Sequence, residues 1–211
     1  MIIHDVEQGS DEWKRLRLSI PTASQFDKIV TPTGRLSKQA DALMYRLAAQ
    51  HFLQRDLTEI GNLYWVNRGR DLEESGALAY EFARGVETKR VGFITTNDGR
   101  IGASPDRLVI GQPGAVEMKC PAPATHIGYL IHGFGPDYYC QAQGQMLVGE
   151  FAWVDLVSYY PGFPLVIERF ERDEEFINTL RDALNKFCIE LAAMILRLEE
   201  MGAQILNAPE V

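Results

Sequence analysis

Apolar and polar residues in the first 84 positions recur with the spacing of helices, and residues that cap helix ends separate them. Ser10 followed by two acidic residues predicts a helix start, and Thr22 with Gln25 has the pattern of a capping box. A buried helix face is predicted by the three-to-four spacing of Ala40, Leu43, Met44, Leu47 and Ala48. The predicted helices cover 10–16, about 22–30, about 37–54 and about 63–84, with a turn at 31–34.

After Gly85 the pattern changes to short extended runs, which predict strands. These runs cover 91–95, 101–104, 107–110, 115–119, 153–160 and 165–170, with a turn at 111–114. Three helices are predicted over about 123–132, about 136–148 and 173–200. The last has an apolar stripe formed by Phe176, Leu180, Leu184, Phe187, Leu191 and Ile195. We therefore expect an α/β fold in which helices flank a mixed central sheet of about five strands.

The length and composition are those of one ordinary globular domain. The chain has 211 residues, of which 46% are hydrophobic and 24% charged, so a single domain over 1–211 is expected. No apolar run approaches the roughly 18 residues that span a bilayer, and the first residues lack the features of a signal peptide. Three widely spaced cysteines favour a reducing compartment and are too few for a four-thiolate cluster. We expect a cytoplasmic protein with no membrane segment.

The net charge of −8 is unevenly distributed along the chain. Residues 1–70 carry ten Lys and Arg against eight Asp and Glu, whereas residues 71–211 carry eleven against twenty-one. Within 12–38 six basic residues stand against two acidic ones. Such a stretch can line a groove for a polyanion while the acidic remainder limits nonspecific binding, although basic residues on a solvated helix face explain it equally well.

Two carboxylates and a lysine lie close together in the predicted sheet. Asp106 follows Pro105, which favours a strand end, and a Glu-x-Lys pattern follows at Glu117 and Lys119. Because side chains alternate along a strand, Glu117 and Lys119 point to one face while Val116 and Met118 face the core. The hairpin turn at 111–114 brings Asp106 beside Glu117. Oxygen ligands of this kind bind Mg²⁺, which indicates a metal-dependent phosphodiesterase of the PD-(D/E)xK type.

A solvated hairpin explains the same three residues without any chemistry, because charged residues are common at strand ends. The apolar context favours a metal site. Glu117 and Lys119 flank Met118 in a strand that is otherwise interior, and buried charges without a partner or metal are costly.

Five sequence blocks in one order resemble the lambda-type phage exonucleases, the alkaline exonuclease or YqaJ group of the PD-(D/E)xK nuclease superfamily. They span residues 6–145, about two-thirds of the chain. The blocks are 7–13 with 16–18 and 22–24, then 68–73, 103–106, 117–121 and 138–143. The resemblance implies a single nuclease domain over 1–211 with a restriction-endonuclease-like core.

The resemblance also implies roles for individual residues. Glu73, Asp106, Glu117 and the Met118 main-chain carbonyl would bind one or two Mg²⁺, for which Mn²⁺ can substitute. Lys119 would serve the attacking water, assisted by Gln141 and Tyr138. The residues that would hold a DNA 5′-phosphate are Arg17, Thr22 and Ser24, with Arg35 as a weaker candidate. Where the family usually has Gly after the Pro-Asp, this chain has Arg107, which could add a phosphate contact.

Members of this group degrade one strand of linear double-stranded DNA from 5′ to 3′ and leave a 3′ overhang for a single-strand annealing recombinase. They form a homotrimer ring that threads the DNA. The resemblance therefore implies the same activity and assembly here, for a phage- or prophage-encoded protein in the cytoplasm of the bacterial host.

Other interpretations of these residues stay open. Thr22 and Ser24 can be helix caps, Glu73 can face solvent, and Tyr138 can belong to the core. Residues 64–66 (Tyr-Trp-Val) form either a wedge between DNA strands or part of a buried helix face. The rival functions are a structure-specific or restriction-like endonuclease on the same fold, a non-catalytic DNA-end-binding module, and a metal-binding protein unrelated to nucleic acids.

Overall fold

The computed structural model describes residues 1–57 and 63–206, and of the side chains between 63 and 71 it describes only that of Arg68. The α-helices are α1 (Asp11–Leu16), α2 (Ala40–Leu53), α3 (Leu63–Arg84), α4 (Pro123–His132), α5 (Tyr139–Gly149) and α6 (Glu174–Glu200). Two short 3₁₀ helices are η1 (Ala23–Lys28) and η2 (Gly135–Tyr138). In the described part of the chain, no helix is long and apolar enough to cross a membrane.

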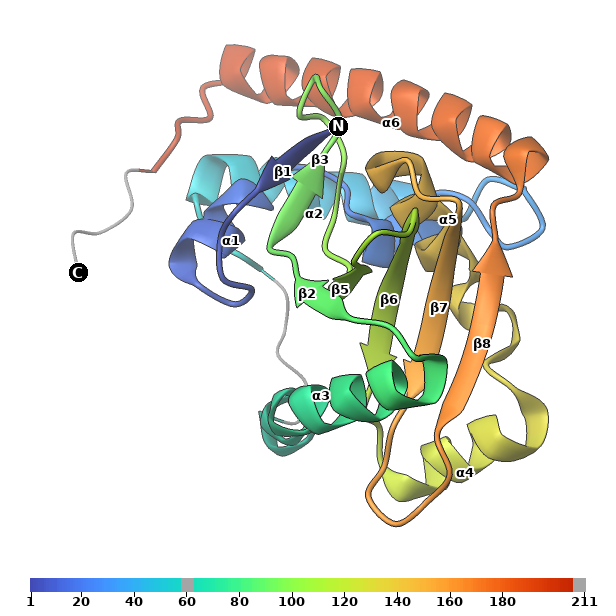
Figure 1. Cartoon of the computed structure of the whole chain (residues 1–211). Helices are drawn as coiled ribbons and strands as arrows, with labels where there is room; N and C mark the ends of the chain where they lie inside the picture. The colour runs from blue at the N-terminus through green and yellow to red at the C-terminus, as the bar shows by residue number, and fades with distance from the viewer. Residues whose placement is uncertain (58–62, 207–211) are drawn as a thin grey trace.

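A mixed sheet of five strands forms the centre of the molecule (Figure 1). Its strands, in spatial order, are β2 (Thr88–Arg90), β5 (Arg107–Val109), β6 (Gly114–Lys119), β7 (Trp153–Ser158) and β8 (Val166–Glu171). The β6 and β7 strands are parallel, and the other neighbours are antiparallel. The predicted α/β class with a mixed sheet of about five strands flanked by helices is confirmed.

The predicted runs at 91–95 and 101–104 belong instead to a second, three-stranded sheet. This sheet contains β1 (Ile2–His4), β3 (Phe93–Thr95) and β4 (Gly102–Ala103) in the order β1-β3-β4. Strands β1 and β2 are absent from the prediction because each has only three residues and lacks a buried alternating face. The predicted helix over 22–30 is a 3₁₀ helix, and the one over 136–148 begins with a 3₁₀ turn before α5.

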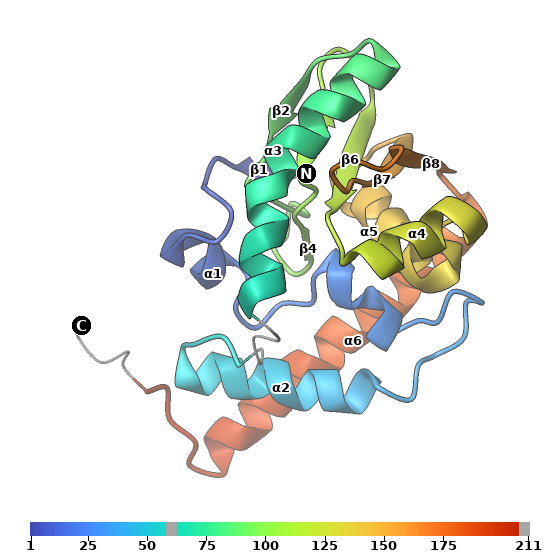
Figure 2. The same ribbon diagram turned by 90° about the horizontal axis from the view of Figure 1, so that it is seen from below.

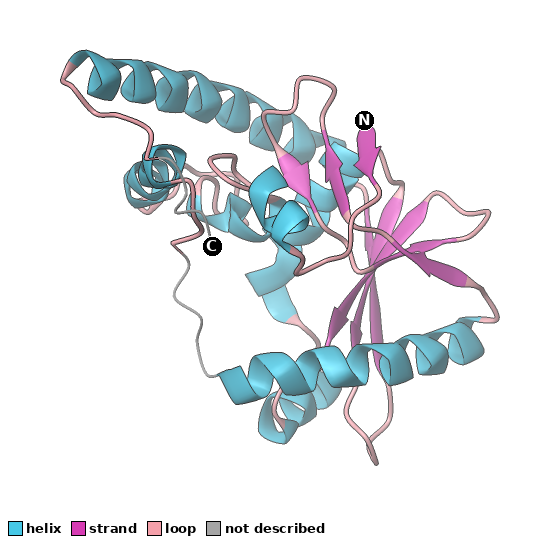
Figure 3. Ribbon diagram, turned by 90° about the vertical axis from the view of Figure 1, so that its left-hand side faces the viewer, coloured by secondary structure: helices cyan, strands magenta, loops and turns pink. Residues whose placement is uncertain are grey.

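Helices cover the central sheet on both faces (Figure 3). Helix α3 packs on the face to which Val116 and Met118 point, where these side chains share a core with Ala77 and Tyr80. On the other face α5 packs against β7 and β8, and α6 and η1 pack against α5, with α2 against α6. The alternation predicted for β6 is confirmed, and it places Glu117 under α5. Figure 2 shows α2 and α6 crossing below this layer.

A glycine lets α3 approach the sheet closely. A Cβ atom at Gly76 would lie 3.0 Å from Met118 Sδ and 3.1 Å from the Cβ of Tyr159. Gly76 lies on α3 about one turn after Glu73, so this close approach sets how near Glu73 comes to strand β6.

Candidate active site

The β5–β6 hairpin places Asp106 directly beside Glu117. Arg107 is paired with Val116 in the ladder, and the Asp106 N–H donates to the Val116 carbonyl at 3.1 Å. The Asp106 Oδ2 atom accepts the Met118 N–H at 2.5 Å. This main-chain bond fixes the Asp106 carboxylate against the strand that carries Glu117, as the spacing of the two residues predicts.

Negative charge is concentrated around Asp106. Burial, followed by the charges of Glu117 and Glu73, raises the pKa of the Asp106 carboxyl well above its ordinary value. Glu73, Asp106 and Met118 line one cavity of about 670 Å³, together with the segment 5–9. The structure therefore brings Glu73 from α3 to the side of the site that Asp106 and Met118 face.

These residues fit a divalent cation in charge and in donor type. Carboxylate and main-chain oxygens are what Mg²⁺ prefers, and a bound cation would offset the burial and the carboxylate repulsion that raise the pKa of Asp106. Among the described residues, however, no three His, Cys, Asp or Glu side chains form a ready-made metal cluster. Both Glu117 oxygens accept hydrogen bonds from lysine and glutamine side chains, so this carboxylate is held by donors of the protein itself.

Three donors hold the Glu117 carboxylate, whose residue is 6% exposed. Lys119 Nζ and Gln141 Nε2 donate to Oε1, each at 2.7 Å, and Gln145 Nε2 donates to Oε2 at 2.6 Å. Burial alone would lower the pKa of Lys119, but the charge and hydrogen bond of Glu117 outweigh it and raise that pKa. Lys119 is therefore an ammonium group, which can donate hydrogen bonds and balance negative charge but cannot act as a base in this arrangement.

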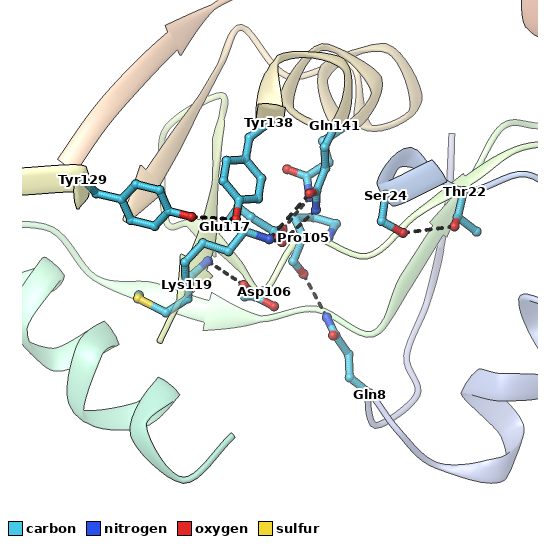
Figure 4. Close-up of polar contacts among 12 residues, drawn as sticks. Gln8, Thr22, Ser24, Pro105, Asp106, Glu117, Lys119, Tyr129, Tyr138 and Gln141 are labelled. Atoms are coloured by element: carbon cyan, nitrogen blue, oxygen red, sulfur yellow. Dashed lines mark hydrogen bonds and ion pairs between the residues drawn. The ribbon is translucent and has the colours of Figure 1, made fainter. Parts of the chain in front are cut away.

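Tyr138 lies over the ammonium of Lys119. The distance from Lys119 Nζ to the centre of the Tyr138 ring is 4.7 Å, within the range of a cation–π contact. The Tyr138 hydroxyl is 2.9 Å from the hydroxyl of Tyr129 in α4, and this hydrogen bond anchors the Tyr138 side chain. Figure 4 shows Tyr138 and Gln141 extending toward Lys119 and Glu117, close to Asp106.

A second group of polar residues surrounds Arg17. Its guanidinium donates to Ser104 Oγ at 3.0 Å and to Thr22 Oγ1 at 3.5 Å, and its Cζ lies 4.1 Å from the Trp13 ring centre. Thr22 Oγ1 lies 3.4 Å from Ser24 Oγ, and Figure 4 shows these two hydroxyls facing each other. Burial lowers the pKa of Arg17 to about 10, so the cation is poorly solvated. The structure thus brings Arg17, Thr22 and Ser24 together.

Arg35 lies outside this group in the described structure. Its side chain is exposed, and its main chain closes the turn with Thr31, whose N–H donates to the Arg35 carbonyl at 2.8 Å. Neither cavity that is lined by Arg17 or by Asp106 includes Arg35 among its lining residues.

Comparison with known proteins places the site in a family. A family model described as the YqaJ-like viral recombinase domain matches residues 12–152, well over half of the chain. The chain belongs to this family. The matched range contains every predicted metal, catalytic and phosphate-binding residue, and it confirms the resemblance on which those roles rest.

Solved structures resemble this chain along most of its length. The alkaline exonuclease LHK-Exo from Laribacter hongkongensis is 31% identical, with a TM-score of 0.81, and the match covers 92% of this chain and 98% of that one. LHK-Exo in complex with dAMP gives 32% identity with the same coverage and TM-score. A phage-related exonuclease from Haemophilus somnus 129PT, 17% identical with a TM-score of 0.67 over 85% of this chain and 96% of that one, shares the fold. No curated protein matches the chain.

The site of the YqaJ-like domain contains residues that sequence reasoning missed. Ser104 accepts from both Arg17 and Trp13 Nε1, the latter at 3.1 Å, and so connects the Arg17 group to the segment that ends in Asp106. Gln8 Nε2 donates to the Pro105 carbonyl at 2.9 Å, which steadies the same segment (Figure 4). Gln145 contacts Glu117, and its spacing of four residues from Gln141 on a predicted helix was a usable signal.

The sequence also singled out Arg107 as a possible phosphate contact and residues 64–66 as a possible wedge. Arg107 is engaged with Glu74 Oε2 at 2.5 Å, so its guanidinium is held against α3. The side chains of 64–66, considered as a strand-separating wedge, lie outside the described residues.

Proposed function

We propose that this YqaJ-like domain is a metal-dependent exonuclease. It degrades one strand of linear double-stranded DNA from the 5′ end, releases mononucleotides and leaves a 3′ overhang. The observation that carries the proposal is the 2.7 Å contact of Lys119 with Glu117, beside Asp106, which itself lines the cavity that Glu73 lines. The similarity to an alkaline exonuclease over nearly the whole of both chains supports it.

In this proposal Glu73, Asp106, Glu117 and the Met118 carbonyl hold Mg²⁺, with Mn²⁺ as a substitute. When bound, the cation supplies Lewis-acid chemistry, since it withdraws charge from the scissile phosphate and makes an attacking water more acidic. Lys119, kept charged by Glu117, donates to that water and balances the charge that develops on the phosphate. Gln141 and Tyr138 hold the ammonium in place, through a 3.5 Å contact with Gln141 Oε1 and through the Tyr138 ring.

The Arg17 group would recognise the 5′-phosphate. A guanidinium with two hydroxyls at a helix start suits a phosphate dianion, and incomplete solvation of Arg17 favours an anionic partner. Such a pocket ties cleavage to a chain end, which distinguishes the exonuclease from an endonuclease on the same fold. Residues 1–211 would act together as one nuclease domain.

We further propose that three copies form a ring around the DNA and that the 3′ overhang passes to a single-strand annealing recombinase, in the cytoplasm of a bacterial host. The ring accounts for a net charge of −8 in a DNA-binding protein if the basic stretch 12–38 lines its channel. Light scattering of the purified protein tests the assembly, and a monomeric mass would contradict it.

Digestion of defined DNA ends tests the activity. A linear duplex with 5′-phosphorylated, 5′-labelled ends is incubated with Mg²⁺ or EDTA, beside a covalently closed circle and with Asp106→Asn as the inactive control. Release of labelled 5′ mononucleotides from linear DNA alone, only with Mg²⁺ and only by the wild type, is the expected result. A cut circle would indicate an endonuclease. Retention of linear ends without cleavage would indicate an end-binding module and overturn the roles of Asp106, Glu117 and Lys119.

A further inference from the structure

Gln145 of α5 is buried against Glu117 and holds the carboxylate oxygen that Lys119 and Gln141 do not reach. The residue is 1% exposed, and its Nε2 donates to Glu117 Oε2 at 2.6 Å. Gln141 and Lys119 both donate to Oε1. Among the described residues, Gln145 is therefore the side chain that holds Oε2, and without it Glu117 would be fixed at one oxygen only.

The other half of the Gln145 amide is unpaired. Its Oε1 is buried and accepts no hydrogen bond from any donor in the described part of the chain. Turning the amide over would place this oxygen against the Glu117 carboxylate, so the contact with Glu117 fixes the orientation. A buried acceptor without a donor lowers stability, and an apolar side chain of similar size would avoid that cost. The hydrogen bond to Glu117 is therefore the interaction that accounts for a glutamine at this position.

Gln143, on the same helix and also 1% exposed, shows what a purely structural glutamine looks like here. Its Nε2 donates to the Glu171 carbonyl at 2.9 Å, and its Oε1 accepts the Asp173 N–H at 3.0 Å. Both halves of this amide are used, and they join α5 to the end of β8 and the start of α6. Gln143 does not contact Glu117, so it provides a matched control.

We propose that Gln145 is a positioning residue that fixes the Glu117 carboxylate for the divalent cation. The proposal rests on the function proposed above. With Gln141 one helical turn away, Gln145 gives each Glu117 oxygen one amide donor from the same face of α5, which sets the plane of the carboxylate. A carboxylate oxygen that accepts one hydrogen bond retains a lone pair for a cation. Without Gln145, the carboxylate pivots about Oε1 toward Lys119 and gives up part of its affinity for the cation.

The test compares Gln145→Met with Gln143→Met in the full chain. Mn²⁺ binding is measured by calorimetry without DNA, the melting temperature in EDTA, and the Mg²⁺ concentration that gives half-maximal cleavage. We expect Gln145→Met to weaken Mn²⁺ binding by roughly tenfold or more, as partners of metal ligands typically do, and to lower the melting temperature because the buried Glu117 Oε2 loses its donor. Gln143→Met should lower the melting temperature and leave the Mn²⁺ affinity unchanged.

Unchanged Mn²⁺ affinity in Gln145→Met would overturn the proposal, and so would failure of both Gln145→Met and Gln145→Leu to fold in EDTA. The binding readout does not depend on cleavage. A wild-type protein that binds Mn²⁺ but cuts no DNA would contradict the proposed nuclease function while the Gln145 comparison still stands on its affinities. A wild-type protein that binds no Mn²⁺ would overturn both.

Discussion

Glu74 and Arg107 form an ion pair between the residues that directly follow Glu73 and Asp106. Arg107 Nη2 lies 2.5 Å from Glu74 Oε2, and Arg90 Nη2 lies 2.8 Å from the same oxygen. Arg107 also contacts the Thr88 hydroxyl at 3.3 Å. Because its two partners lie next to proposed metal ligands on different elements, the pair ties α3 to β5 where Glu73 must meet Asp106. Arg107, at a position where the group usually has glycine, therefore holds α3 against β5.

The Glu74–Arg107 pair should contribute to metal binding and modestly to stability. The Arg107 side chain is 11% exposed but that of Glu74 is 55%, so solvent weakens the pair. We expect Arg107→Ala to cost about 1 kcal/mol of unfolding free energy and to raise the Mg²⁺ requirement for cleavage. Arg90→Ala is the matched control, since Arg90 binds the same oxygen with a side chain that is 65% exposed. Urea unfolding and Mg²⁺ titrations measure both effects, and equal losses in the two variants would contradict the assignment.

The ionised carboxylate of Asp106 should lower the stability of the folded protein when no metal is bound. Burial and the charges of Glu117 and Glu73 raise the pKa of Asp106, which means that the folded protein disfavours its ionised form. Asp106→Asn keeps an oxygen for the Met118 N–H and removes the charge. We expect this variant to be more stable than the wild type in EDTA, on the order of 1 kcal/mol, and to be inactive.

Asp98→Asn is the opposite control for that prediction. Hydrogen bonds from Thr96 and Arg100 lower the pKa of Asp98 to about 2, so its charge stabilises the folded state. Neutralising it should not raise the melting temperature in EDTA. If Asp106→Asn melts at or below the wild-type temperature, the carboxylate is not under the repulsion described here. Added Mg²⁺ should raise the melting temperature of the wild type and not that of Asp106→Asn.

The long periodic elements could be predicted from sequence because one face of each is continuously buried. The stripe from Phe176 to Leu191 is buried in α6, and α3 has the predicted start and end. The orientation of Glu117 and Lys119 followed from the alternation of strand residues alone. The Asp106–Glu117 pairing followed from the hairpin turn, because a short turn fixes the register of its two strands.

The rest could not be predicted because it depends on contacts between distant segments. Gln145 is the exception, because its helical spacing of four residues from Gln141 is visible in the sequence and both amides contact Glu117, whereas Gln143, two residues from Gln141, faces another side of α5. Ser104 reaches Arg17 because Thr22 forms a bridge with Gly102, a contact across 80 positions that no local pattern encodes. The edge strand β2 is polar and only three residues long.

The close approach of α3 to the sheet should depend on Gly76. A methyl group there meets Met118 Sδ at 3.0 Å and the Tyr159 Cβ at 3.1 Å, so Gly76→Ala should push α3 outward by a few tenths of an ångström. Because α3 carries Glu73, we expect reduced cleavage together with a loss of about 1 kcal/mol of stability. Gly128→Ala in α4 is the control: its added Cβ meets nothing within 4 Å, and helix propensity should stabilise it by about 1 kcal/mol. Equal effects of the two substitutions would contradict the packing argument.

The preference for phosphorylated ends should weaken at high pH through Arg17. Burial lowers its pKa to about 10, whereas an exposed arginine keeps its charge well above that pH. The pH dependence of kcat/KM reports the free enzyme, so the ratio of kcat/KM for 5′-phosphorylated over 5′-hydroxyl ends should be constant below this pKa and fall as pH rises through about 10.

Two variants sharpen this pH test. Arg17→Lys retains a cation of lower ordinary pKa that the same burial lowers further, so the ratio should begin to fall at a lower pH than in the wild type. Arg17→Gln should show little preference for phosphorylated ends at any pH, while cleavage of 5′-hydroxyl ends persists because Lys119, Glu117 and Asp106 are intact. A wild-type kcat/KM ratio that stays constant past pH 10 would show that residues other than Arg17 recognise the 5′-phosphate. An Arg17→Gln variant that still prefers phosphorylated ends would show the same. The 5′-hydroxyl substrate, measured at each pH in the same buffer, separates this effect from any general loss of folding in alkali.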